Sequence, residues 1–282
     1  MTPADLTCVD YAVRDGVATI TLNRPQRRNG WTGRMAADYR WALHFADTDP
    51  DVGAVVLTGA GEVFCVGADS DVLADVGDAE GSYEREATAL PPYPEGTPAA
   101  LRRNHLYPLT IGVPVFAAIN GGCAGAGFVL ATYADVRYAG ASARISPAFP
   151  GLGLPAEYGL AWMLPRIVGL HAAAEILLTN ARLSAEEACA AGYVRKVFPD
   201  AELVDAVHDI AARTARECAP SSLRVLKRQL YVDAWGELGD AYTRSVEDMD
   251  AMLRGREFHE GLAALRERRR PSYRPTPSTA FP

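Results

Sequence analysis

GGCAGAGFVLATYAD, residues Gly121–Asp135, is the stretch around which the rest of the chain is interpreted. Its small residues leave almost no side chain between the backbone N–H groups and an approaching ligand. Phe128–Tyr133 predicts the first turns of a helix, whose N-terminus carries unpaired donors and a partial positive charge. The segment therefore predicts a site for an oxyanion. A tight turn that lets a helix pack closely on a sheet would explain the same residues, and that alternative stays open.

A second small-residue stretch, FCVGADS at Phe64–Ser70, lies upstream. It follows Gly53–Gly59, a short apolar run typical of a buried parallel strand. Val9–Val13 and Val17–Leu22 alternate around Asp15-Gly16 and predict a β-hairpin. Both glycine-rich stretches thus follow predicted strands. FCVGADS follows Gly53–Gly59, and the stretch that begins at Gly121 follows Val113–Ile119. Val136–Ala139 is expected to be the next strand.

Residues Asp71–Leu109 break this pattern. Glycine, glutamate and proline accumulate there, and the segment predicts a long excursion with at most a helical piece around Ser82–Leu90. A lid or pocket wall and a passive surface insertion are both consistent with this composition.

The C-terminal part is expected to be mainly helical. Gly159–Val168 ends at Gly169, and Ser184 with Glu187 forms a predicted capping box. Val194–Phe198 is expected to be a short strand. Four helices and a proline-rich tail are expected after it: Glu202–Cys218, Ser221–Ala234, Leu238–Arg254, Glu257–Arg268 and Pro271–Pro282. We therefore divide the chain into a core at 1–200 and a helical C-terminal region at 201–282.

Composition narrows the class of protein. The chain has 282 residues, 49% hydrophobic and 22% charged, as in ordinary globular proteins. Its 5 cysteines show no CxxC spacing, which favours a reduced, cytoplasmic protein over a disulfide framework or a zinc site. A net charge of −7 argues against nucleic acid as a partner, although a local basic pocket remains possible. No signal peptide, membrane span or metal-binding spacing is predicted.

Taken together, the motifs resemble those of the crotonase, or enoyl-CoA hydratase/isomerase, superfamily. The matching segments are TLNRPQRRN, AVVLTGAGEVFCVGAD, PVFAAINGGCAGAGFVLATYADVRYA, PRIVG and LSAEEACAAGYVRKVFP. The resemblance implies an α/β fold with a repeated ββα superhelical core and a helical C-terminal oligomerisation region that assembles trimers or hexamers. It also implies an acyl-CoA thioester as partner, with coenzyme A as part of the substrate and no prosthetic group.

In this family two backbone N–H groups stabilise negative charge on the thioester oxygen, and the matching positions are Ala68 and Ala126. Loss of one such donor typically costs about 3–4 kcal/mol of transition-state stabilisation. Ala126 stands where many members have glycine, which is harmless if its φ is negative and strained if its φ is positive.

The resemblance also implies residues for coenzyme A. Arg27 matches a basic position that meets the phosphates, and Val66 and Asp69 match positions that contact the adenine end, largely through backbone. Arg268–Arg270 with Tyr273 resembles a terminal patch that can reach the cofactor of a neighbouring subunit. For both arginine groups, a solvated surface cluster is the alternative.

The chain departs from a typical hydratase of this family at the two catalytic glutamates. The matching positions are Val129 and Phe149, neither of which can move a proton. Glu157, counted back from PRIVG, matches the catalytic aspartate of other branches that include chlorobenzoyl-CoA dehalogenases. In an apolar pocket it could act as general acid or base. Its alternative role is a solvated carboxylate that stabilises the following helix start.

Five residues are weaker candidates for the acyl pocket: His105, Tyr107, Val129, Phe149 and Tyr158. A histidine in a long loop is expected to be solvated, and Tyr158 to be structural. The first hypothesis for function is an enoyl-CoA hydratase/isomerase-type enzyme that hydrates, isomerises or cleaves a ring. A catalytically silent acyl-CoA-binding protein and a C–C bond hydrolase of a non-CoA diketone are the alternatives.

Overall fold

The computed structural model describes residues 1–77 and 90–273, and the expected helical piece at 82–90 lies almost wholly outside them. A larger sheet has the strand order β1-β2-β3-β5-β7-β10. Its strands are β1 (Val9–Arg14), β2 (Val17–Leu22), β3 (Ala54–Gly59), β5 (Val115–Ile119), β7 (Val136–Gly140) and β10 (Val197–Phe198). Neighbours are parallel except β1 and β2, which form the expected hairpin around Asp15 and Gly16, both with positive φ.

A smaller sheet lies against the larger one, with the order β4-β6-β8-β9. Its strands are β4 (Val63–Cys65), β6 (Gly122–Ala124), β8 (Arg144–Ser146) and β9 (Leu183–Ser184). Along the chain, β3, β5 and β7 of the larger sheet are each followed by a strand of the smaller sheet, and β4, β6 and β8 then lead toward α2 (Ser70–Gly77), α3 (Ala126–Thr132) and α4 (Leu160–Leu178). This strand–strand–helix repeat confirms the expected α/β class.

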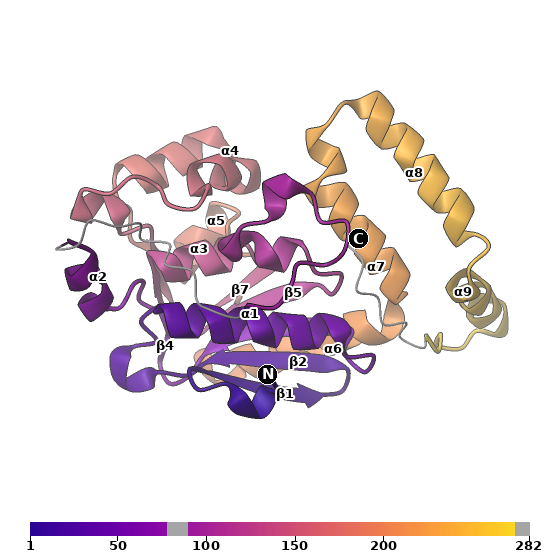
Figure 1. Ribbon diagram of the computed structural model, residues 1–282, viewed down its shortest axis with the longest axis horizontal. Helices are drawn as coiled ribbons and strands as arrows, with labels where there is room; N and C mark the ends of the chain where they lie inside the picture. The colour runs from indigo at the N-terminus through magenta and orange to yellow at the C-terminus, as the bar shows by residue number, and fades with distance from the viewer. Residues whose placement is uncertain (78–89, 274–282) are drawn as a thin grey trace.

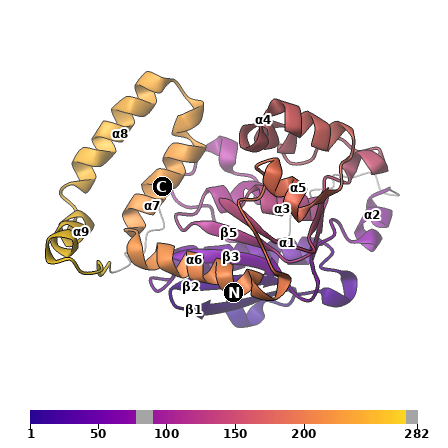
Figure 2. The same cartoon turned by 180° about the vertical axis from the view of Figure 1, so that it is seen from behind.

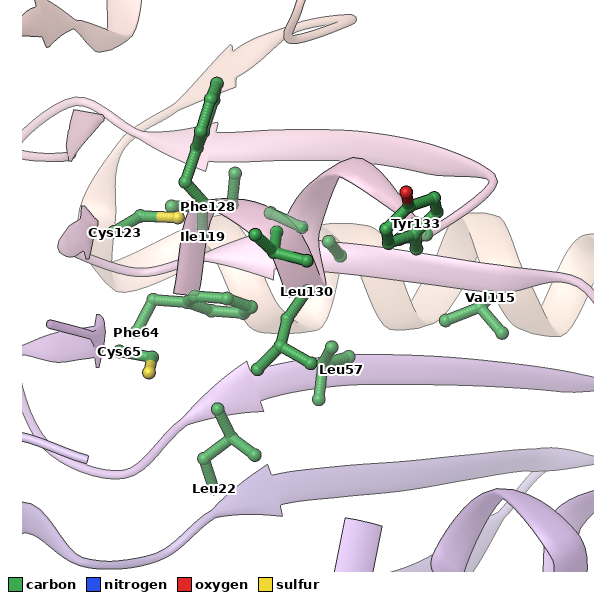
Figure 3. Close-up of a cluster of buried hydrophobic side chains, with 14 of the residues drawn as sticks. Leu22, Leu57, Phe64, Cys65, Val115, Ile119, Cys123, Phe128, Leu130 and Tyr133 are labelled. Carbon is green, nitrogen blue, oxygen red and sulfur yellow. The ribbon is translucent and has the colours of Figure 1, made fainter. Parts of the chain in front are cut away.

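The two faces of the larger sheet are buried under different helices. Along β3, Val55 and Leu57 belong to the core beneath α1 (Gly33–Thr48) and α3, whereas Ala54 and Val56 face α6 (Leu203–Glu217). Figure 3 shows Leu57 packed with side chains of α3 and of the smaller sheet. The expected N-cap Thr32 accepts a hydrogen bond from the Met35 amide at 3.2 Å. The parallel strands therefore present their carboxyl ends, where the two glycine-rich stretches begin, on a rigid core.

α4 is 19 residues long with a mean hydropathy of 1.3, so by length and composition it could cross a membrane. The sequence did not predict this feature. At Gly169, however, φ is 80° and ψ is 159°, which breaks the helix where a stop was predicted. Each half is shorter than the roughly 20 residues that a membrane-spanning helix requires.

The C-terminal region is helical, as predicted. α5 (Ala185–Ala190) begins with the expected capping box, and α6 is followed by α7 (Pro220–Tyr231), α8 (Leu238–Met252) and α9 (Arg256–Glu267). α7 ends three residues earlier than predicted and continues into a 3-10 turn, η7 (Asp233–Trp235). Figures 1 and 2 show α6 lying on the sheet while α8 and α9 extend away from the core. The division at residue 200 stays a prediction.

Candidate active site

The two glycine-rich bends touch each other. Gly67 has φ 105° and Gly125 has φ 52°, in the region that favours glycine. A Cβ on Gly67 would lie 3.1 Å from the Ala124 carbonyl oxygen, and one on Gly125 would lie 3.4 Å from the Gly67 Cα. Side chains at these two positions would push the bends apart. The glycines therefore place Ala68 and Ala126, the next residues in each bend, on neighbouring segments.

The amides of Ala68 and Ala126 have no hydrogen-bond acceptor in the part of the chain that the structure describes. Around Ala68, the Trp31 amide donates to the Gly67 carbonyl at 2.7 Å and the Asp69 amide donates to the Trp31 carbonyl at 2.9 Å. These two bonds use the Gly67 carbonyl and the Asp69 amide, and they leave the amide of Ala68 itself without a partner. Ala126 does not have positive φ, because Gly125 takes the left-handed conformation, so the alanine carries no backbone strain.

Two other glycines in the run serve close packing. A Cβ on Gly127 would lie 2.2 Å from the Cys65 carbonyl oxygen, and one on Gly121 would lie 1.9 Å from the Glu62 carbonyl oxygen. For these two positions the alternative of a tightly packed turn is confirmed. α3 begins at Ala126, two residues before the predicted start, and has only 7 residues, so its dipole is short.

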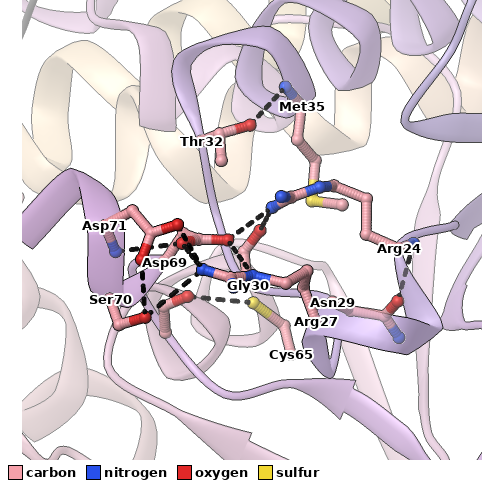
Figure 4. A network of polar contacts seen from close by, with 11 residues as sticks. Arg24, Arg27, Asn29, Gly30, Thr32, Met35, Cys65, Asp69, Ser70 and Asp71 are labelled. Atoms are coloured by element: carbon pink, nitrogen blue, oxygen red, sulfur yellow. Dashed lines mark hydrogen bonds and ion pairs between the residues drawn. The ribbon is translucent and has the colours of Figure 1, made fainter.

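The bend that contains Gly67 and Ala68, which we call the first bend, is held by ion pairs between Asp69, Arg24 and Arg27 (Figure 4). We call this cluster the Asp69 clamp. Asp69 Oδ2 lies 2.9 Å from Arg24 Nη1, and Asp69 Oδ1 lies 2.6 Å from Arg27 Nη2. The Asp69 side chain is only 4% exposed. Hydrogen bonds from Arg27 hold the pKa of the Asp69 carboxyl well below its usual range. Both residues were expected to contact coenzyme A, and here they bind each other.

A cavity of about 740 Å³ opens beside the first bend. We call it the arginine cavity, after Arg28, Arg144 and Arg182 in its wall; Val66 and Asn180 also line it. Within the described residues, the guanidinium groups of Arg28 and Arg182 have no hydrogen-bond or ion-pair partner, and the buried Oδ1 of Asn180 is also unpaired. Val66, two residues before Ala68 in the chain, thus shares a cavity with three positively charged side chains.

Glu157 lies half-buried just before α4, and its carboxylate has no hydrogen-bond partner among the described residues. Burial raises the pKa of this carboxyl. The next two residues, Tyr158 (φ 51°) and Gly159 (φ 78°), are both left-handed. Positive φ is costly for a bulky tyrosine. The Tyr133 hydroxyl donates to the Tyr158 carbonyl and so helps to hold this turn.

His105 connects the Glu157 turn to the first bend. Its ring stacks on that of Tyr158 with 3.6 Å between centroids, and its centroid lies 6.2 Å from that of Trp31, which pairs with Ala68. Both ring nitrogens are buried without a partner among the described residues, and burial lowers the pKa of His105 to about 4. The expectation that this loop histidine is simply solvated was therefore wrong.

A second cavity, of about 410 Å³, begins at Tyr158. We call it the aromatic cavity, after its rings Tyr133, Tyr158, Trp162, Tyr231 and Trp235; η4 (Asn104–Leu109) supplies Leu106 and Leu109. None of the wall residues that the structure describes is charged. The Asp71–Leu109 segment therefore does contribute to a pocket wall through its described C-terminal part.

The remaining candidates lie in other surroundings. Val129 and Phe149 are fully buried in the core. Tyr107 is buried against Arg40, whose guanidinium carbon lies 4.7 Å from the ring centroid. Tyr273 lines a groove between α7, α8 and α9, and its role at a neighbouring subunit stays a prediction. Within the described ranges, no group of three or more His, Cys, Asp or Glu side chains could hold a metal ion.

Sequence reasoning gave no site role to Trp31, Arg144 and Arg182. Trp31 follows the RRNG turn and carried no signal of its own, because its pairing with Ala68 joins two distant segments. Arg144 and Arg182 lie 38 residues apart in sequence and meet only through the pairing of β8 with β9. Predicting that they meet would have required knowing how β8 pairs with β9.

Comparisons with known proteins agree with this geometry. The family model for enoyl-CoA hydratase/isomerase matches residues 12–276. A probable enoyl-CoA hydratase from Mycobacterium tuberculosis is 37% identical over 265 residues, covering 92% of this chain and 90% of the relative. A 4-chlorobenzoyl coenzyme A dehalogenase from an Arthrobacter species is 32% identical over 255 residues, covering 90% and 88%. The solved structure of a putative enoyl-CoA hydratase from Streptomyces coelicolor has a TM-score of 0.84 at 28% identity and covers 97% of this chain and 96% of its own. With two touching bends, a repeated ββα core and a family match over nearly its whole length, this chain belongs to the enoyl-CoA hydratase/isomerase family of the crotonase superfamily.

Proposed function

We propose that this protein is an acyl-CoA enzyme that moves a proton on the acyl chain, with double-bond isomerisation as its best-supported reaction. The thioester oxygen lies between the amides of Ala68 and Ala126, and Glu157 is the general acid and base. The observation that carries this proposal is the contact between Gly67 and Gly125, which brings two unpaired amides onto adjoining bends.

Two fixed donors suit the chemistry of a thioester enolate. When a base removes a proton from the carbon next to the carbonyl, negative charge develops on the oxygen, and preorganised amides stabilise it without reorganisation. Gly125 and Gly67 take the left-handed conformations, so neither alanine has to.

Glu157 has the surroundings of a group that transfers protons. Its carboxylate is half-buried and unpaired among the described residues, and burial raises its pKa above the ordinary value for a glutamate. The Tyr158 ring stacks on His105, and the His105 ring lies near Trp31. These contacts link the turn that contains Glu157 to the first bend.

The absence of glutamate at Val129 and Phe149 favours isomerisation over hydration. Both side chains are fully buried and apolar, so neither could hold and activate a water. A single carboxylate suffices for isomerisation: Glu157 takes a proton from the carbon next to the thioester, and returns it two carbons farther along the dienolate. Hydration with Glu157 alone is the second candidate.

The coenzyme A end has a suitable place in the arginine cavity. Arg28, Arg144 and Arg182 supply the planar, permanently charged groups that bind phosphates well. Arg27, expected in this role, is already paired with Asp69 at 2.6 Å. We therefore propose Arg28 and its two neighbours as the main phosphate contacts, with Arg27 orienting the first bend.

Glu157→Gln tests the mechanism. We expect kcat on 3-enoyl-CoA substrates to fall at least about 100-fold while the affinity for coenzyme A esters stays the same, since the amide keeps the shape but cannot transfer a proton. Glu186→Gln, an exposed glutamate on α5, is the matched control. An unchanged rate in Glu157→Gln would remove Glu157 from the mechanism.

Self-association is proposed as well. α8 and α9 expose large apolar side chains that include Leu238, Met249, Phe258 and Leu265. With α7 they enclose a groove of about 1120 Å³. An apolar surface of this kind is typical of an interface between subunits. We propose a trimer or hexamer, which light scattering of the purified protein would distinguish from a monomer.

A further inference from the structure

The aromatic cavity is built from rings that come from separate parts of the chain. Tyr133 follows α3, Tyr158 precedes α4, Trp162 lies on α4, and Tyr231 and Trp235 lie at the end of α7 and in η7. Each belongs to an element that is anchored elsewhere in the core. Their convergence on one cavity gives it an unusually aromatic wall.

The rings are held in place by contacts with one another and with groups outside the cavity. The guanidinium carbon of Arg166 lies 3.6 Å from the Trp162 ring centroid, and Trp162 meets Trp235 edge to face at 4.2 Å. α7 is fixed by the buried Lys227 ammonium, which lies 2.9 Å from the Asp135 carboxylate and donates to the Pro108 carbonyl at 2.9 Å. The cavity is thus largely preformed, which lowers the entropic cost of binding.

Two of the three cavity tyrosines have their hydroxyls beside protein groups. The Tyr133 hydroxyl donates to the Tyr158 carbonyl, and burial together with the Asp135 carboxylate raises the pKa of the Tyr231 hydroxyl. Among the described residues of the wall, none is charged. Apart from the Tyr158 hydroxyl and the indole N–H groups of Trp162 and Trp235, the wall offers ring faces and edges with aliphatic side chains between them, and these give a charged group no ion-pair partner.

The cavity lies at the far end of α3 from the bends. Ala126 begins this helix of 7 residues and Tyr133 follows its last residue, so about 10 Å of helix separates them. Because bond angles make an extended carbon chain advance only about 1.3 Å per bond, a group that starts at the thioester needs about eight bonds to reach that end. A four-carbon acyl chain would not fill the cavity.

We infer that the acyl group is uncharged and carries a flat ring several carbons from the thioester. This inference rests on the proposed function, because it takes the thioester to lie at Ala68 and Ala126. An aromatic ring can pack offset or edge-on against Trp162, Trp235 and Tyr158, and each such pair adds affinity beyond the buried area.

Three saturated thioesters with eleven acyl carbons test it: 5-phenylpentanoyl-CoA, undecanoyl-CoA and undecanedioyl-CoA. None can be isomerised, so calorimetric titration of the full chain measures equilibrium binding, with free coenzyme A as reference. We expect the phenyl ester to bind about tenfold more tightly than undecanoyl-CoA, as two aromatic pairs would give. The ester with a terminal carboxylate should bind at least about tenfold more weakly than undecanoyl-CoA.

Trp162→Leu should reduce the phenyl preference to about twofold or less, and Trp235→Leu should do the same. Both side chains are partly exposed, so neither substitution should unfold the protein. Trp41→Leu, on α1, is the matched control and should leave the ratio unchanged. If coenzyme A esters bind but the phenyl ester has no advantage, or the dicarboxylate binds equally well, the inference is wrong and the proposed function stands. If no ester binds, both fail.

Discussion

The two bends at the site have the same shape requirement but are held in different ways. The first bend, at Val66–Ser70, is fixed by charge: Asp69 binds Arg24 and Arg27 and is nearly fully buried. The second, at Gly121–Gly127, is fixed by packing, since Gly121 and Gly127 leave no room for a Cβ against the backbone of Glu62 and Cys65. Charged side chains therefore position the Ala68 amide, whereas close backbone packing at two glycines positions the Ala126 amide.

This difference predicts different sensitivities. The packed bend has no charged side chain, and its one thiol, Cys123, is fully buried. The clamped bend lies beside Trp31, whose ring is close to that of His105. Added volume should therefore damage the second bend, and changes of charge or pH should act on the first.

Ala126→Pro removes the donor of the packed bend without adding length to it. Ala126 is the first residue of α3, where proline costs no helix hydrogen bond. We expect kcat to fall about 10²–10³-fold, as for loss of one oxyanion donor. Because Ala126 is buried, the added ring should also lower the melting temperature, and that effect is judged against the control below. Ala185→Pro, at the first residue of α5, is the control for proline itself. Full activity in folded Ala126→Pro would show that this amide contributes nothing.

Gly127→Ala tests the packing of the second bend. The new Cβ would lie 2.2 Å from the Cys65 carbonyl oxygen, so backbone must move. We expect a loss of about 3 kcal/mol in the free energy of unfolding, measured in urea. Gly33→Ala, where nothing lies within 4 Å of the added Cβ, should be neutral or slightly stabilising. Equal stability of the two variants would contradict packing as the cause.

A pH series tests the side of the site near the first bend. The pKa of His105 is lowered by burial from 6.5 to about 4, so between these values the unfolded state binds more protons than the folded state. Stability therefore rises with pH across this window and is lost as pH falls from about 6.5 to 4. We expect a loss of about 2–3 kcal/mol in the wild-type chain that is absent in His105→Phe. Parallel curves for the two proteins would rule this out.

Asp69→Asn weakens the clamp of the first bend and leaves the second bend untouched. Because Arg24 and Arg27 keep some solvent contact, we expect about 1–2 kcal/mol of destabilisation, below the cost of breaking a fully buried pair. Asp71→Asn removes the exposed partner of Arg27 and should change nothing measurable. Urea titrations of both variants give the comparison, and identical curves would mean that the clamp is only a surface contact.

Much of the fold could be predicted because local signals agree with one another. The Asp15-Gly16 turn, the Thr32 cap, the stop at Gly169 and the Ser184–Glu187 capping box all lie where short-range chemistry indicates. Strand β8 gave no such signal, since three residues carry too little periodicity.

The site was predictable only in part. The two bends and Ala68, Ala126 and Glu157 could be proposed from glycine spacing and family resemblance. The pairing of Arg27 with Asp69, the burial of His105 and the meeting of Arg144 with Arg182 could not, because each depends on segments that are distant in sequence. Side chains that touch only in the folded chain leave no periodic pattern.

The most direct measurement is a crystal structure of the protein with bound acetoacetyl-CoA. The account predicts the thioester oxygen within about 3.2 Å of both the Ala68 and Ala126 amide nitrogens. A thioester oxygen that reaches only one of these amides, or neither, would contradict it.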